Sequence, residues 1–264
     1  MSIIEIDKII FINVFILVCK MLIDIHCHLD HLSGNLDKVI DNARKAGLKV
    51  ILTSGTNPTS NRKVLEFAEK YDIVKPCLGL YPVQENKFNV DEEIKFIEKN
   101  EDKITAVGEV GMDYFLVRDD LGEQKAVFEK IISLVEKINK PIIVHSRKAE
   151  RNCVDMLESS KLKKIVMHCF SGRKSLVKKV IDNGWFLTIP ASVVRSQQFQ
   201  DNAKTAPITQ LFCETDAPYL SPFKDRRNEP AFVAESYKKI AEINGMELKE
   251  VVNNVWMNWQ KTFE

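Results

Sequence analysis

Short apolar runs alternate along nearly the whole chain with longer stretches in which apolar residues recur every three or four positions. Short runs are typical of buried strands, and the longer periodic stretches are typical of amphipathic helices. The expected strands are 22–26, 50–53, 73–78, 105–109, 142–145, 165–168, 185–188 and 211–214. The expected helices are 36–46, 58–71, 91–99, 122–139, 149–159, 174–183, 230–244 and 247–263.

This alternation predicts a (β/α)8 barrel, an α/β fold of one domain. An open doubly wound sheet has the same alternation, but its Gly-x-Gly-x-x-Gly phosphate loop is absent before the first expected helix. The seventh unit is the least defined, because residues 191–205 show little periodicity. No linker divides the chain, so the barrel is expected to span residues 21–264.

Residues 1–20 form a separate N-terminal extension in this scheme. Its apolar segment, 9–19, is too short to span a bilayer, and the basic start and cleavage site of a signal peptide are missing. The segment is expected either to pack on the barrel or to result from an over-long start, with Met21 as the true initiator. The second interpretation is favoured.

Composition narrows the class of protein. The chain has 264 residues, is 45% hydrophobic and 28% charged, and carries a net charge of +1, which argues against disorder. With this balance there is no broad positive surface for nucleic acid or acidic membranes, so a nucleic-acid substrate would need a local basic patch. The six cysteines are scattered, which indicates reduced thiols in a cytoplasmic protein.

Metal-binding residue types recur at the carboxyl ends of the expected strands, where the active sites of barrels lie. His26 and His28 share one face of the first strand, because alternate residues of a strand point the same way. Taken singly, each such residue is more often a core histidine or a turn residue. Their recurrence on five strands favours a metal centre. The candidate ligands are His26, His28, Glu109, His145, His168 and Asp216.

Six nitrogen and carboxylate ligands are too many for one tetrahedral ion and suit two divalent ions about 3.5–4 Å apart. We expect Glu109 to bridge the ions, with His26, His28 and Asp216 completing one site and His145 and His168 the other. Ligands of this kind accept Mg, Mn, Zn, Co or Ni. Such ions activate a water for hydrolysis, and Asp216 is the candidate that accepts its proton.

Further candidates surround this centre. Asp24 and Glu214 lie on the same strands as ligands, and we expect them to orient histidines or to be structural buried carboxylates. Arg147, Arg173 and Arg227 follow the fifth, sixth and eighth strands and are candidates for binding phosphate. A solvated charged surface is the alternative for each arginine.

From Met21 onward the chain resembles the TatD-type deoxyribonucleases, a branch of the metal-dependent hydrolases. The matching stretches are IDIHCHLD (23–30), GEVGMDY (108–114), VHSR (144–147), HCFSG (168–172), ETDAPYL (214–220) and RNEP (227–230). The resemblance implies a (β/α)8 barrel that binds two divalent cations at the six residues above and hydrolyses DNA phosphodiesters. Two stretches depart from the family pattern: Tyr81 stands in Gly-Leu-Tyr-Pro where Gly-x-His-Pro is usual, and 189–191 lacks the usual glycine-rich turn.

Together these features predict a divalent-metal-dependent hydrolase, an exonuclease-type deoxyribonuclease acting on DNA ends or single strands. No membrane contact is expected, and a monomer is compatible with the sequence. The alternative is a two-metal hydrolase of an amide, lactone or aminoacyl ester, because the same activated water attacks carbonyl carbon. A scaffold protein without turnover is disfavoured by the complete ligand set.

Overall fold

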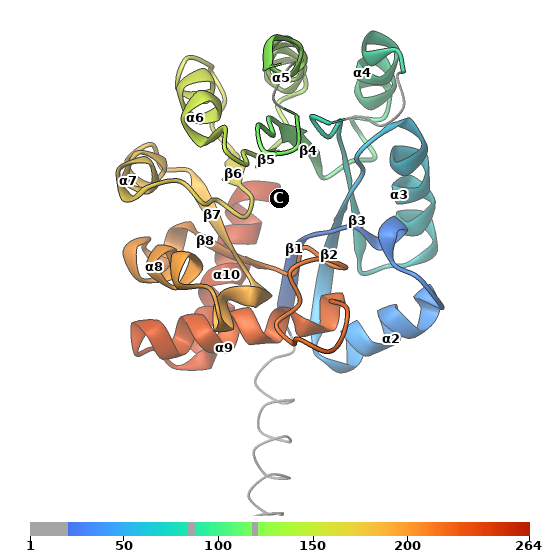
Figure 1. The fold of residues 1–264 in the computed structure, drawn as a ribbon. Coiled ribbons are helices and arrows are strands. Elements are labelled where there is room, and N and C mark those ends of the chain that lie inside the picture. Colours follow the sequence, from blue (N-terminus) through green and yellow to red (C-terminus); the bar gives the residue numbers. More distant parts are fainter. Residues whose placement is uncertain (1–20, 84–87, 118–120) are drawn as a thin grey trace, which may run out of the picture.

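The computed structural model describes residues 21–83, 88–117 and 121–264. Eight parallel strands form one sheet in which each strand pairs with the next in sequence, and the sheet curls into a ring (Figure 1). The expected (β/α)8 barrel is confirmed. The strands are β1 (Leu22–Cys27), β2 (Leu48–Ser54), β3 (Val74–Leu78), β4 (Ala106–Gly111), β5 (Ile142–His145), β6 (Ile165–Met167), β7 (Phe186–Pro190) and β8 (Leu211–Glu214).

The α-helices follow the strands in turn, and α2 to α9 are arrayed around the outside of the ring in Figure 1. The α-helices are α2 (Leu36–Lys45), α3 (Pro58–Lys70), α4 (Val90–Lys99), α5 (Leu121–Ile138), α6 (Glu150–Glu158), α7 (Lys174–Asp182), α8 (Gln197–Thr205), α9 (Val233–Asn244) and α10 (Leu248–Phe263). The short 3-10 helices are η1 (Leu29–His31), η2 (Ala191–Val194), η3 (Ile208–Gln210) and η4 (Pro230–Phe232).

Local sequence explains where several helices begin. Asn35, Asn57 and Asn89 precede α2, α3 and α4, and each asparagine side chain accepts a backbone N–H bond from the first turn. This is the role for which asparagine is favoured at a helix start. Pro58 opens α3, where its missing N–H costs no helical bond.

The ring closes between β8 and β1 just beyond the carboxyl end of β8. The backbone N–H of Asp216 donates to the carbonyl of His26 at 2.9 Å, and that of His28 donates to Ala217 at 2.7 Å. His26 at the end of β1, His28 just beyond it and Asp216 after β8 therefore belong to the same backbone ladder. Their relative positions depend on this closure.

At the same junction between β8 and β1, a side chain makes hydrogen bonds to the backbone of β1 in place of a neighbouring strand. The hydroxyl of Tyr237 on α9 accepts a bond from the backbone N–H of Ile23 at 3.0 Å and lies 3.1 Å from the carbonyl of Ile23. Because buried backbone groups need partners, Tyr237 satisfies a part of β1 that β8 does not reach.

The interior of the barrel is apolar except at the carboxyl ends of the strands. All residues of β1, β4, β7 and β8 are buried, which is typical of parallel strands covered on both faces. Buried polar side chains, including His26, Glu109 and Glu214, concentrate toward one end of the ring. Most of the buried charged side chains thus lie at this end; Glu93 on α4, which is bound by Arg62 and Asn61, is an exception.

The seventh unit contains a helix that the periodicity did not predict. Residues 191–205 hold η2 and the nine-residue α8, whose buried residues are only Asn202 and Ala203. The amide of Asn202 donates to the carbonyl of Phe170 at 2.7 Å, so this helix docks partly through a polar bond. A helix with so small an apolar face carries almost no hydrophobic signal.

The expectations for residues 1–20 lie outside the described residues. Among the described helices, none combines the length and apolar character needed to cross a membrane.

Candidate metal centre

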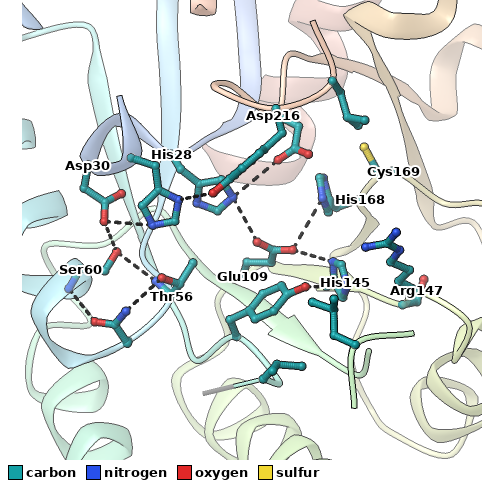
Figure 2. A pocket seen from close by; sticks show the side chains of 18 of the residues that line it. His28, Asp30, Thr56, Ser60, Glu109, His145, Arg147, His168, Cys169 and Asp216 are labelled. Atoms are coloured by element: carbon teal, nitrogen blue, oxygen red, sulfur yellow. Dashed lines mark hydrogen bonds and ion pairs between the residues drawn. The ribbon is translucent and has the colours of Figure 1, made fainter. Parts of the chain in front are cut away.

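The six candidate ligands meet at the carboxyl end of the barrel (Figure 2). In the first group, Nε2 of His26 lies 3.2 Å from Nε2 of His28, and each is 3.6 Å from Oδ1 of Asp216. Oε2 of Glu109 lies 3.6 Å from the first of these nitrogens and 3.2 Å from the second. Donors around a tetrahedral ion with bonds of 2.0–2.1 Å are about 3.4 Å apart. The group therefore has the spacing of a single-ion site.

The other oxygen of Glu109 faces the second pair of histidines. Its Oε1 lies 2.7 Å from Nδ1 of His145 and 3.6 Å from Nε2 of His168. One carboxylate thus presents one oxygen to each pair of histidines, the arrangement that a bridging ligand needs. Burial alone would raise the pKa of Glu109, but the surrounding imidazoles outweigh it and hold the pKa well below its usual range.

Each histidine has one ring nitrogen bound to the protein and the other directed into the centre. Nδ1 of His28 lies 3.0 Å from the carbonyl of Ser54, and Nδ1 of His26 lies 3.2 Å from the hydroxyl of the same serine. A carbonyl only accepts, so Nδ1 of His28 carries a proton, and Nε2 is the nitrogen that can give its lone pair to a cation. Metal-binding histidines are commonly held in this way.

Carboxylates hold the other two histidines. Nδ1 of His168 lies 2.9 Å from Oε2 of Glu214, and Nε2 of His145 lies 3.0 Å from Oδ2 of Asp113. Burial would lower the pKa of His168, but the charge and hydrogen bond of Glu214 raise it to about 9. Glu214 is therefore placed where the sequence analysis expected a residue that orients a histidine.

Asp24 occupies a different position from Glu214. Its carboxylate accepts bonds from the backbone N–H of Thr215 at 2.8 Å, from the hydroxyl of that threonine and from the backbone N–H of His26 at 3.3 Å. It joins β1 to the segment after β8, and among the described residues none of its hydrogen bonds reaches a histidine ring. Asp24 thus fixes the backbone that carries His26 and Asp216.

Asp113 has more contacts than its sequence position indicates. Besides His145, its carboxylate accepts the backbone N–H of Phe115 at 2.8 Å, the N–H of Leu116 at 2.9 Å and the hydroxyl of Tyr81 at 2.8 Å. Asp113 shapes this turn and also holds a candidate ligand.

His31, the one histidine of the sequence that is not a candidate ligand, lies beside the candidate metal centre, a position that the sequence analysis did not predict. Its ring stacks on that of His28 with centroids 4.9 Å apart, and its Nδ1 lies 3.2 Å from the hydroxyl of Tyr219. The only sequence signal is its spacing of three residues from His28, one turn of η1. Nothing in that spacing identifies Tyr219 as a partner.

A cavity of about 1140 Å³ opens over the centre and is lined by five of the six candidate ligands. Arg147 also lines it, with its guanidinium carbon 3.7 Å from the ring centroid of Phe115. Arg173 is exposed at the start of α7, and Arg227 is exposed and donates to the hydroxyl of Ser33 at 3.1 Å. Neither of these two is among the described residues that line the cavity.

Known proteins share the whole architecture. The model of the family described as TatD related DNase matches residues 23–264. Deoxyribonuclease TATDN3 of Homo sapiens is 34% identical over 258 residues, which cover 92% of this chain and 94% of that protein. An uncharacterized metal-dependent hydrolase of Methanocaldococcus jannaschii, MJ1582, is also 34% identical and covers 92% of this chain and 96% of its own length. The crystal structure of the TatD homolog YJJV of Escherichia coli K12 aligns with a TM-score of 0.85 at 25% identity, over 93% of this chain and 98% of that one.

Proposed function

The chain belongs to the TatD related DNase family, and from that membership we propose that it is a divalent-metal-dependent deoxyribonuclease that hydrolyses phosphodiester bonds. One observation carries the proposal: Glu109 presents its two oxygens to two separate histidine pairs beneath a large open cavity. This is the arrangement expected of a two-metal hydrolase.

We propose that two divalent cations occupy the centre, sharing Glu109. His26, His28 and Asp216 would complete one site, and His145 and His168 the other. The distances to Glu109 support this assignment, since the ring nitrogens of both histidine pairs lie within 3.6 Å of a buried carboxylate whose low pKa keeps it ionised. Cations bound there would lower the pKa of a water and offset charge that develops on phosphate oxygens.

The protein's own groups position the proton acceptor. Asp216 follows β8 with a φ of +56°, a conformation that is rare outside glycine and is concentrated at functional sites. Its side chain is 14% exposed and lines the cavity. It can therefore contact an attacking water in the cavity and also the neighbouring His26 and His28. We propose that Asp216 orients this water and accepts its proton, with in-line attack on phosphorus.

Arg147 is the proposed phosphate-binding residue. Its guanidinium matches phosphate oxygens in bidentate fashion and is held at the cavity by Phe115. Among the described residues that line the cavity, the cations are Arg147 and Lys63. So few cations support action on chain ends or single strands, because wide contact with a duplex needs many phosphate contacts. A cytoplasmic location is also proposed, since the cysteines among the described residues are free thiols.

The test uses the full chain stripped by chelator and reloaded with Mg²⁺, Mn²⁺, Zn²⁺, Co²⁺ or Ni²⁺. Single-stranded DNA, duplex DNA, RNA, an aminoacyl ester and a lactone are offered to each form. We expect hydrolysis of DNA that chelator abolishes and metal restores. Hydrolysis of the esters but not of DNA would instead support the carbonyl-directed alternative.

A matched pair of variants tests the shared carboxylate. Glu109→Gln should lower the bound metal below two ions per chain and reduce kcat on the order of 100-fold or more. Glu235→Gln, on the outer helix α9, removes a surface carboxylate and should leave metal content and rate unchanged. Two tightly bound ions in Glu109→Gln would contradict the bridging role.

A further inference from the structure

Large apolar side chains that are exposed to solvent gather at the mouth of the cavity. Two of them, Phe115 and Leu116, lie in the loop after β4, and two more, Tyr219 and Leu220, lie in the loop after β8. In a ring of eight strands in sequence order, β4 and β8 stand on opposite sides. The remaining exposed large apolar side chains among the described residues are Met21, Leu121 and Met257.

Tyr219 is the best-placed member of this group. The residue is 51% exposed and lines the cavity, and its ring centroid lies 6.1 Å from that of His28. Its backbone N–H donates to the carbonyl of Asp216 at 2.8 Å, and its carbonyl accepts from the amide of Asn228 at 2.7 Å. With its hydroxyl bonded to His31, the ring is fixed at both ends and keeps an open surface.

The opposite wall combines apolar and cationic groups. Leu116, which is 54% exposed, lines the cavity, and its neighbour Phe115 carries the guanidinium of Arg147 on its ring. The backbone N–H groups of Phe115 and Leu116 both donate to the carboxylate of Asp113. The mouth thus offers fixed apolar surfaces on two sides, and the positive charge of Arg147 lies on one of them.

Building on the proposed function, we propose that Tyr219 is a stacking site for an unpaired nucleobase next to the bond that is cleaved, with Leu116 facing it across the mouth. Aromatic side chains beside a cationic group are how proteins bind single strands, because every base has a flat face that can stack. In a duplex those faces are covered by neighbouring base pairs. The stacking site therefore selects unpaired ends and tolerates any base.

The occupant is a nucleobase rather than a second copy of the chain because the apolar groups border the candidate metal centre itself. A partner chain seated there would cover the cavity that Arg147, Tyr219 and the candidate ligands line. An unpaired base leaves the adjoining phosphate free to reach those same groups.

The experiment compares two single-stranded DNA substrates on the Mn²⁺-loaded full chain. One is an ordinary oligonucleotide, and the other carries abasic deoxyribose residues in place of its terminal nucleotides. Stacking of one base changes affinity by about 10-fold to 100-fold. We expect kcat/KM of the wild-type chain to favour the ordinary substrate by that factor, and Tyr219→Ala to reduce this ratio to about one.

Two further variants complete the design. Tyr219→Phe keeps the ring and loses the hydroxyl, so it should retain the wild-type ratio. Met257→Ala removes an apolar side chain of 64% exposure on α10, outside the cavity lining of the described residues, and should also retain it. Together they separate stacking from the bond to His31 and from a general loss of apolar surface.

The outcomes distinguish this inference from the proposed function. If wild-type protein cleaves both substrates equally, or Tyr219→Ala slows both equally, the stacking site is wrong while nuclease activity stands. If no metal supports cleavage of either substrate, the proposed function itself fails, and the stacking site with it. If Tyr219→Ala converts a dimer to a monomer in size-exclusion chromatography and leaves the ratio unchanged, the surface belongs to a second copy.

Discussion

Asp113 and His145 form a carboxylate–imidazole pair in which Oδ2 lies 3.0 Å from Nε2. The hydrogen bonds of Asp113 outweigh its burial and lower its pKa to about 2, so the group is ionised and only accepts. Nε2 of His145 therefore carries a proton, and Nδ1 lies 2.7 Å from the ionised Glu109. Burial would lower the pKa of His145, but these two carboxylates raise it, so both ring nitrogens hold protons until a cation takes the place of the one on Nδ1. The same carboxylate holds the backbone of Phe115 and Leu116, which joins the candidate ligand to the mouth of the cavity.

Asp113→Asn should lower the affinity for one of the two proposed ions more than for the other. The amide can present a donor to His145 and so favours the wrong tautomer of the ring. Loss of such an outer partner typically costs 10- to 100-fold in metal affinity. Calorimetric titration of the stripped chain with Zn²⁺ should show one site weakened by about that factor. Asp182→Asn, in an exposed pair with Lys178, is the control, and equal weakening of both sites would contradict the assignment.

Much of this architecture is readable in the sequence because its signals are local. Each strand is a short apolar run, and four histidines and two acids lie at or just beyond strand ends, so the barrel alone brings them together. The observed boundaries of β5 and β8 are the predicted ones, and those of the other strands differ by one or two residues; β6, for example, ends at Met167 and leaves His168 in the following loop.

What could not be predicted depends on tertiary contacts. Asp113 and His145 are 32 residues apart, and Asp24 and Thr215 are 191 apart, so no spacing rule connects them. The arginines show that similar sequence positions can lead to different places. Arg147 and Arg173 both follow strand ends, but Arg147 lines the cavity, whereas Arg173 is exposed and is not among the described lining residues. A long side chain can leave a loop in many directions, and sequence order does not decide among them.

Asp216→Asn should reduce kcat by about 100- to 10,000-fold, the range for loss of a positioned general base, and leave KM nearly unchanged. The reason is that an amide keeps the shape of the side chain and cannot accept the proton of water. Single-turnover kinetics on a 5′-labelled oligonucleotide measure the chemical step directly. Metal content should be determined on the same sample, because a lost ion would mimic a lost base. An unchanged kcat would remove Asp216 from the mechanism.

Tyr237→Phe should destabilise the barrel at its seam. The substitution removes the hydroxyl that contacts both the N–H and the carbonyl of Ile23, and a buried backbone group left without a partner costs about 1–3 kcal/mol. Urea denaturation should show this loss in the free energy of unfolding, with little change in the m-value. Tyr114→Phe, whose hydroxyl donates to the sulfur of Met112, is the control and should cost far less.

The folding stability of the metal-stripped chain should decrease as pH rises, and that of the metal-loaded chain should increase. In the stripped chain Glu214 raises the pKa of His168 to about 9 from an ordinary 6.5. A raised pKa contributes stability that is complete below the unfolded value, so the contribution is lost as pH rises from 6.5 to 9. For this buried group the loss is on the order of 3 kcal/mol.

In the loaded chain, cations and protons compete for the same ring nitrogens. As pH rises from 6.5 to 9, cations therefore bind more tightly and the stability of the folded chain increases. Thermal unfolding of both forms at intervals between pH 6 and 9 measures the two slopes. His168→Gln, which cannot titrate, should flatten the slope of the stripped chain. Parallel slopes for the two forms would mean that His168 does not bind metal, because only a shared nitrogen makes proton and cation exclude each other.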